Sequence, residues 1–230
     1  MSKRSEIIDP SEYRKGVTGL MYTELLGWID LGHALGGDIT RTLSKFRQGE
    51  MSRKPYYLVQ YEQIMRAGKF ATGRYIGWNI KRGRSQHEIH SILLAMVMRT
   101  AVLFENWQAQ PWFSWYTDSG FSGEDLVSDL LGFYSVVRPM NYINMIQPVS
   151  KEAALRRWDH YGPIGNFKNK GFKPLLFPDP AIENVPLTPY KANLPGFMTA
   201  ITPFTDFRSG IVRIIDKASI LNEYRGFRIP

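Results

Sequence analysis

The sequence predicts an α+β fold: a mainly helical single domain, residues 1–230, with a small β-hairpin and a long irregular C-terminal wrap. Apolar residues recur at helical spacing over 85–108. Two tyrosine-containing, partly apolar segments, 55–65 and 70–80, flank Ala67-Gly68 and are typical of a hairpin. Most of the 14 prolines follow residue 161, which predicts an irregular wrap over 161–230.

The first 46 residues are expected to form a strand and two helical segments. After a polar lead-in of 16 residues, 19–24 is short and mixed, which favours a strand. Residues 29–35 begin a helical stretch that Gly36-Gly37 interrupts, and 38–46 is predicted as an amphipathic helix with a basic outer face.

Two further helices are predicted in the second half of the chain. Ser122-Gly123-Glu124-Asp125 resembles a capping box and opens a helix over 122–137, before Pro139. Residues 150–160 favour a shorter helix, and 211–215 a returning strand or helix.

The composition excludes several classes of protein. With 43 % hydrophobic and 22 % charged residues, the 230-residue chain can bury a sizeable core and is not disordered. Its longest apolar run, 92–98, is far below the about 20 residues that span a bilayer, so we expect no transmembrane segment. The first ten residues contain no apolar core of a cleavable signal peptide. The absence of cysteine excludes disulfides, thiolate nucleophiles and zinc fingers.

The net charge of +8 is unevenly distributed. Residues 41–84 contain eleven Lys and Arg against Glu50 and Glu62, a net of +9. This favours a polyanionic partner, such as nucleic acid, anionic lipid or bacterial cell wall, although a solvated basic face gives the same pattern. Residues 105–130 contain five acids and no base, so their carboxylates need distant partners, a cation or shifted pKa values.

The acidic stretch contains the candidate catalytic residues. Glu105 lies near the end of an apolar helix, where an unpaired carboxylate is costly to bury. Asp125 and Asp129 are four residues apart and share one helical face. If the two helices pack antiparallel, Glu105 approaches Glu124 and Asp125. Such carboxylates suit acid–base cleavage of a glycosidic bond or a hard metal ion, whereas Glu124 and Asp125 could also simply stabilise a helix N-terminus.

Aromatic and histidine residues add weaker candidates. Trp112, Phe113, Trp115 and Tyr116 resemble a platform for stacking sugars or bases, although a core cluster has the same composition. His33 follows Asp30 by three residues, which favours an imidazole beside a carboxylate or a satisfied core histidine. No nucleophile elbow, phosphate-binding loop, dinucleotide fingerprint or calcium-binding loop is present.

Two motifs together resemble a known family. Residues 27–33 (Gly-Trp-Ile-Asp-Leu-Gly-His), followed by Asp38, and residues 120–132 are similar to the two signatures of a bacterial domain family of unknown function, found largely in envelope lipoproteins. Glu105-Asn106-Trp107 also matches that pattern, and the resemblance covers about 17–138. We expect no lipoprotein leader, and the chain has Ser128-Asp129 where the family has Ser-Asn.

The resemblance implies that His33, Glu105, Glu124 and Asp125 belong to one site and that the protein works in the cell envelope. The sequence-based hypothesis is therefore a secreted, antibacterial effector-like toxin that hydrolyses the glycan strands of peptidoglycan. Glu105 would be the general acid, and Asp125 or Glu124 the second carboxylate. His33 would orient the substrate or a carboxylate. The remaining candidates would bind the substrate: Asp30, Asp129, Trp112, Trp115 and Tyr116.

This hypothesis includes delivery to the bacterial periplasm without a cleavable signal peptide, an anionic polymer as substrate, an immunity protein as partner and no cofactor. One alternative is a metal-dependent hydrolase that holds a divalent ion with His33, Glu105 and Asp125. The other is a non-enzymatic basic protein that binds nucleic acid or membrane.

Overall fold

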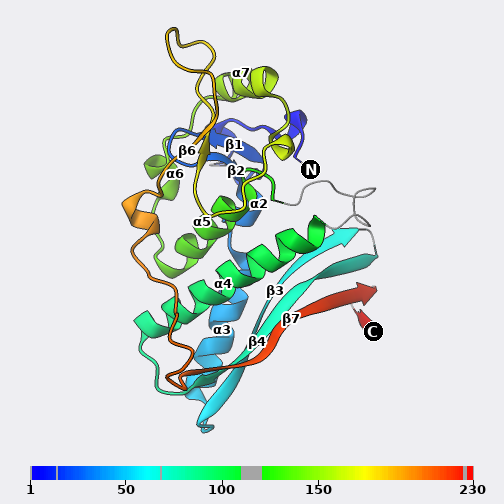
Figure 1. Cartoon of the computed structure of the whole chain (residues 1–230), viewed down its shortest axis with the longest axis vertical. Coiled ribbons are helices and arrows are strands. Elements are labelled where there is room, and N and C mark those ends of the chain that lie inside the picture. Colours follow the sequence, from blue (N-terminus) through cyan, green and yellow to red (C-terminus); the bar gives the residue numbers. More distant parts are fainter. Residues whose placement is uncertain (1, 14, 68, 110–120, 225–226, 230) are drawn as a thin grey trace. The chain divides into compact units, whose positions relative to one another are not determined.

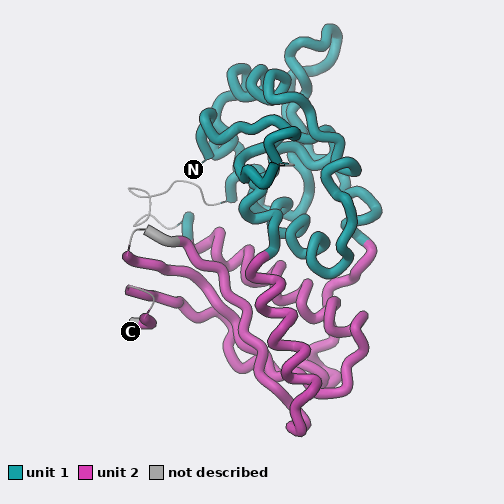
Figure 2. The backbone as a smooth tube through the Cα atoms, turned by 180° about the vertical axis from the view of Figure 1, so that it is seen from behind, with its two compact units in different colours: residues 1–36, 108–199 teal, residues 37–107, 200–230 magenta. Residues whose placement is uncertain are grey.

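The computed structural model describes residues 2–13, 15–67, 69–109, 121–224 and 227–229. These residues form two compact units (Figure 2). Unit 1 comprises Met1–Gly36 and Gln108–Thr199, and unit 2 comprises Gly37–Trp107 and Ala200–Pro230. Each unit combines segments from distant parts of the chain, and the predicted single domain over 1–230 stays a prediction.

Unit 1 contains a small sheet with strand order β1-β2-β5-β6. Its strands are β1 (Leu20–Thr23), β2 (Gly27–Asp30), β5 (Leu175–Leu176) and β6 (Tyr190–Lys191). β2 pairs antiparallel with β1 and parallel with β5. The helical elements of the unit are η1 (Arg4–Glu6), α1 (Pro10–Tyr13), α2 (Leu31–Ala34), α5 (Asp125–Val137), α6 (Tyr142–Met145), α7 (Lys151–Tyr161), η3 (Ile164–Asn166) and η4 (Gly196–Met198).

An aromatic core fixes β2 in unit 1. The Trp28 ring packs edge-to-face on Tyr22 and Trp158, with centroid distances of 5.2 and 5.7 Å. The Tyr22 hydroxyl donates to the Phe177 carbonyl at 2.8 Å and accepts from the Phe177 amide at 2.7 Å. The guanidinium of Arg157, buried between Glu24 and Asp179, lies over the Tyr22 ring. The strand that leads into α2 is therefore held in place by residues from both the N-terminal and the later segment of unit 1.

Unit 2 contains a curled antiparallel sheet with strand order β3-β4-β7-β8, and α4 runs along it (Figure 1). The pairing of β4 with β7 shifts register between Tyr75 and Trp78, where β7 has the extra residues, whereas β4 pairs with β3 without interruption. The buried faces include Val59, Ile76 and Trp78. The elements of unit 2 are α3 (Gly37–Met51), β3 (Tyr56–Ala67), β4 (Phe70–Lys81), α4 (Gln86–Gln108), β7 (Val212–Tyr224) and β8 (Phe227–Ile229).

The predicted mainly helical domain with a small hairpin is wrong. The structure is α+β, and its described residues form two four-stranded sheets. Residues 55–65 and 70–80 are strands as expected, but they form two of the four strands of the unit 2 sheet rather than an isolated hairpin. The C-terminal wrap is also wrong beyond residue 211, because β7 is a 13-residue strand paired with β4. The local sequence of β7 does not reveal a partner strand about 140 residues earlier. The helix expected at 29–35 is also partly wrong, because residues 27–30 form a strand.

One helix among the described residues, α4, is long and apolar enough to cross a membrane by length and composition. Half of its most apolar window is buried inside the protein, and the core helices of soluble proteins have the same character. The absence of a transmembrane segment stays a prediction.

Candidate functional site

The first motif positions a polar pair at the junction of β2 and α2. Gly27 has φ +72°, and a Cβ there would lie 2.1 Å from the carbonyl oxygen of Leu175, so only glycine fits. Trp28, Ile29 and Leu31 are buried. Asp30 ends the strand and His33 lies in the short helix that follows, so these two polar side chains lie outside the core.

Asp30 caps α2 and links it to α5. Its Oδ1 accepts from the amides of Gly32 at 2.7 Å and His33 at 3.4 Å, which satisfies two donors of the first helical turn. The Asp30 amide donates to Ser128 Oγ at 2.9 Å, and that hydroxyl donates to the Glu124 carbonyl at 2.7 Å. Ser128 thus connects β2 with α5, a role that the sequence patterns did not reveal.

Two glycines let the backbones of α2 and α5 touch. A Cβ at Gly132 would lie 2.6 Å from the carbonyl oxygen of His33. Gly36 has φ +61°, and its Cβ would lie 2.5 Å from the Gly132 carbonyl oxygen. Asp129 lies one helical turn before Gly132 and therefore faces His33.

Gly132→Ala should destabilise the protein because its methyl group would press on rigid backbone. We expect the free energy of unfolding to fall by about 1–3 kcal/mol, the usual cost of overpacking, although alanine favours helix. Gly171→Ala is the matched control, since no atom lies within 4 Å of a Cβ at that position. Denaturant unfolding measures both, and equal stabilities would contradict the close approach.

The central feature of the site is a histidine–carboxylate pair. His33 Nδ1 lies 2.9 Å from Asp129 Oδ1; the imidazole is 41 % exposed and the carboxylate only 8 %. Desolvation lowers the pKa of His33, but the hydrogen bond to Asp129 and the charges of Asp129, Asp30 and Asp125 raise that pKa well above its ordinary value. The neighbouring carboxylates therefore favour the cationic form of His33, whose ring is 41 % exposed.

The raised pKa makes stability depend on pH. A pKa above the unfolded value means that His33 contributes its full stabilisation below about pH 6.5, and that this contribution is lost as pH rises through the folded pKa. We expect unfolding free energy to decline from pH 6 to 9, and less steeply in Asp129→Asn. The two proteins differ only at position 129, so identical slopes in denaturant titrations would contradict the pairing.

Glu124 and Asp125 have different environments. Glu124 is 1 % exposed, and its carboxylate accepts hydrogen bonds from the hydroxyls of Ser2 and Ser122. It occupies the N-cap position of α5 without a side-chain capping bond, so the predicted capping box does not form. Asp125 is half-buried, and its charge acts on His33. Asp125, rather than Glu124, belongs to the histidine's surroundings.

Comparison with models of known protein families, with curated proteins and with solved structures gives no match. The resemblance to the envelope family stays a prediction.

The other predicted site residues are placed less completely. Glu105 is 2 % exposed on α4, in unit 2, whereas His33, Asp30, Asp125 and Asp129 belong to unit 1. Its membership of a shared site stays a prediction. The predicted stacking platform, Trp112, Trp115 and Tyr116, lies outside the described residues.

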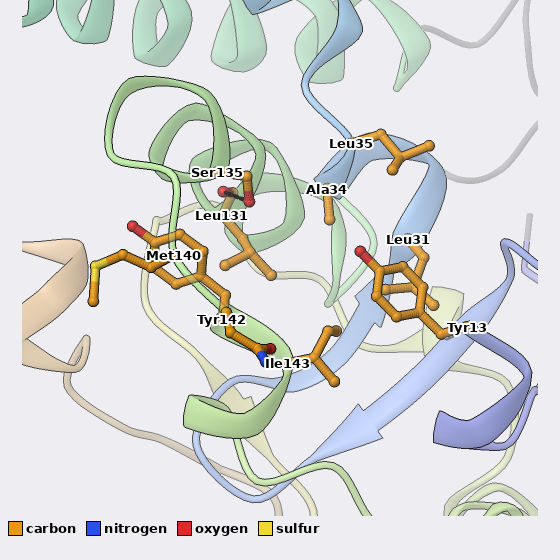
Figure 3. A pocket seen from close by; sticks show the side chains of 10 residues that line it. Tyr13, Leu31, Ala34, Leu35, Leu131, Ser135, Met140, Tyr142 and Ile143 are labelled. Atoms are coloured by element: carbon orange, nitrogen blue, oxygen red, sulfur yellow. Dashed lines mark hydrogen bonds between the residues drawn. The ribbon is translucent and has the colours of Figure 1, made fainter. Parts of the chain in front are cut away.

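A small pocket in unit 1 lies beside α2 but contains none of the predicted site residues (Figure 3). It has a volume of about 220 Å³ and is lined mainly by apolar side chains, among them Tyr13, Leu31, Leu35 and Tyr142. Within the described ranges, no three His, Asp or Glu side chains are grouped as in a metal site.

Proposed function

We propose that the protein is a hydrolase of the bacterial cell wall and that His33 and Asp129 form its acid–base centre. The observation that carries this proposal is the 2.9 Å contact between a half-exposed imidazole and a buried carboxylate. A carboxylate on one ring nitrogen fixes the orientation of the ring and stabilises its cation. The other nitrogen, Nε2, then serves as the group that exchanges a proton with the substrate.

The arrangement supports hydrolysis of a bond whose leaving oxygen is protonated by His33. Cationic His33 would donate a proton from Nε2 to the oxygen that leaves. Asp125 would serve as the second carboxylate, activating water or stabilising a positively charged transition state. Its charge is felt at His33 and its side chain is half-buried, which supports this role. Glu124 is fully buried under two serine hydroxyls and is assigned a structural role instead.

The charge of unit 2 supports an anionic polymer as substrate. The basic stretch 41–84 forms α3, β3 and β4 within this unit, and most of its Lys and Arg side chains are exposed. Such a surface raises the local concentration of a polyanion and accelerates its association. Peptidoglycan glycan strands fit both the charge and the acid–base centre. Delivery to the periplasm and an immunity partner are part of the same proposal.

Incubation with purified peptidoglycan, followed by mass spectrometry of the soluble fragments, tests this function. We expect new reducing-end sugars, in equal yield after exhaustive chelation, and none with His33→Gln. Free stem peptides, lost on chelation and restored by a divalent ion, would favour the metal-dependent alternative. Binding to the polymer without any release would favour a non-enzymatic protein.

A further inference from the structure

A second pocket lies within unit 2, between α3 and the start of α4. Its volume of about 620 Å³ is in the range of small-molecule sites. Four side chains with nitrogen donors line it, Arg47, Arg84, Gln86 and His90, together with apolar walls that include Leu43 and Ile89. The proposed hydrolytic function uses none of these residues.

Several donors in this pocket are not satisfied by the described part of the chain. Arg84 donates from Nη1 to Glu88 at 2.8 Å, but its Nε is buried without a hydrogen-bond partner there. His90 is only 8 % exposed, and the described residues provide no hydrogen bond to its ring. Arg47 is exposed and makes no ion pair with them. A buried donor such as Arg84 Nε is normally paired, so a ligand with acceptor oxygens would remove the cost of leaving that nitrogen without a partner.

The pocket also contains one carboxylate, Glu50, whose oxygens are held by neutral donors. It accepts from the Tyr57 hydroxyl at 2.8 Å, from the Gly83 amide at 2.8 Å and from the Arg84 amide at 3.3 Å. Arg84 is paired with Glu88, so the positive charge that a ligand meets comes mainly from Arg47. Arg47 also affects His90: burial lowers the pKa of His90, and the charges of His87 and Arg47 lower it further, so the ring is neutral and offers one N–H.

We propose that this pocket binds the phosphate group of a small organic phosphate monoester, whose apolar portion lies against Leu43 and Ile89. Two guanidinium groups, an amide and an imidazole offer more donors than the two oxygens of a carboxylate accept. The three terminal oxygens of a phosphate monoester match this set, and guanidinium groups bind phosphate in a forked geometry.

Calorimetric titration of the whole protein with phenyl phosphate, at constant ionic strength, tests this proposal. We expect saturable binding of one molecule, tighter than that of inorganic phosphate because only phenyl phosphate reaches the apolar wall. Arg47→Ala should weaken binding roughly tenfold or more, the usual effect of losing a charged hydrogen bond. Arg47 makes no ion pair with the described residues, so this variant should fold normally.

Lys69→Ala is the matched control, because it removes the same charge in the turn before β4 and does not line the pocket. It should leave the dissociation constant unchanged. Equal weakening in both variants would show unspecific attraction by the basic unit and overturn the proposal. The absence of saturable binding, or equal affinity for inorganic and phenyl phosphate, would also overturn it. Binding is measured without any wall substrate, so failure here is distinct from failure of the hydrolytic function.

Discussion

His33→Gln should lower the rate of wall hydrolysis at neutral pH by about 100-fold or more, the usual scale for losing acid–base assistance. Glutamine keeps a polar group beside Asp129 but cannot transfer a proton. The imidazole is 41 % exposed, and Asp30 caps α2 independently of it, so the fold should survive. The release of reducing ends from peptidoglycan gives the rate, and thermal unfolding by circular dichroism gives the stability.

Asp129→Asn distinguishes a reacting histidine from a structural one. The amide retains the shape of the carboxylate but removes the charge that raises the pKa of His33. A protonated acid at His33 predicts that activity falls at high pH and that this fall moves to lower pH in the variant. Ser135→Ala, on the same helix, should leave the pH profile unchanged. An identical profile for Asp129→Asn and the parent protein would remove His33 from the reaction.

Local patterns predicted three long helices and the pairing of β3 with β4. Helices expected at 85–108, 122–137 and 150–160 correspond to α4, α5 and α7 within a few residues. Helical periodicity and capping are properties of neighbouring residues, so a single sequence contains them. The pairing of β7 with β4 is not local. The pairing depends on a register that places residues such as Arg74 and Ile220 opposite each other, and no pattern within either strand specifies that register.

The same difference between local patterns and long-range contacts explains which part of the candidate site could be predicted. The sequence identified His33, Asp30 and Asp129, but it paired the histidine with Asp30 because the two are close along the chain. In the structure Asp30 caps α2, and the partner of His33 is Asp129, 96 residues later. That contact requires the backbone approach at Gly36 and Gly132, where side chains are absent. The sequence patterns did not assign this role to the two glycines, because a close approach between distant backbones cannot be located from local spacing.

Glu105→Gln tests the sequence-based hypothesis that Glu105 is the general acid. That role predicts activity lower by about 100-fold or more with the melting temperature unchanged or higher, whereas an acid–base centre of His33 and Asp129 predicts activity near that of the parent protein. Glu105 is 2 % exposed on an apolar helix, and burial disfavours a charged carboxylate. Glutamine keeps its shape and removes the charge, so a catalytic acid tolerates the change structurally but loses its proton. A structural Glu105 that pairs with a cation predicts the reverse, because glutamine would leave that cation unpaired and cost several kcal/mol of stability.

Glu88→Gln is the matched control, since it makes the same chemical change in the first turn of the same helix. Its carboxylate is held by Ser85 and Arg84 near the surface, so the variant should lose about 1 kcal/mol of helix capping and no activity. Wall-degradation and melting measurements on the two variants separate the roles. If Glu105→Gln melts lower and degrades the wall at the parent rate, Glu105 is a structural residue, and the proton must come from His33 alone.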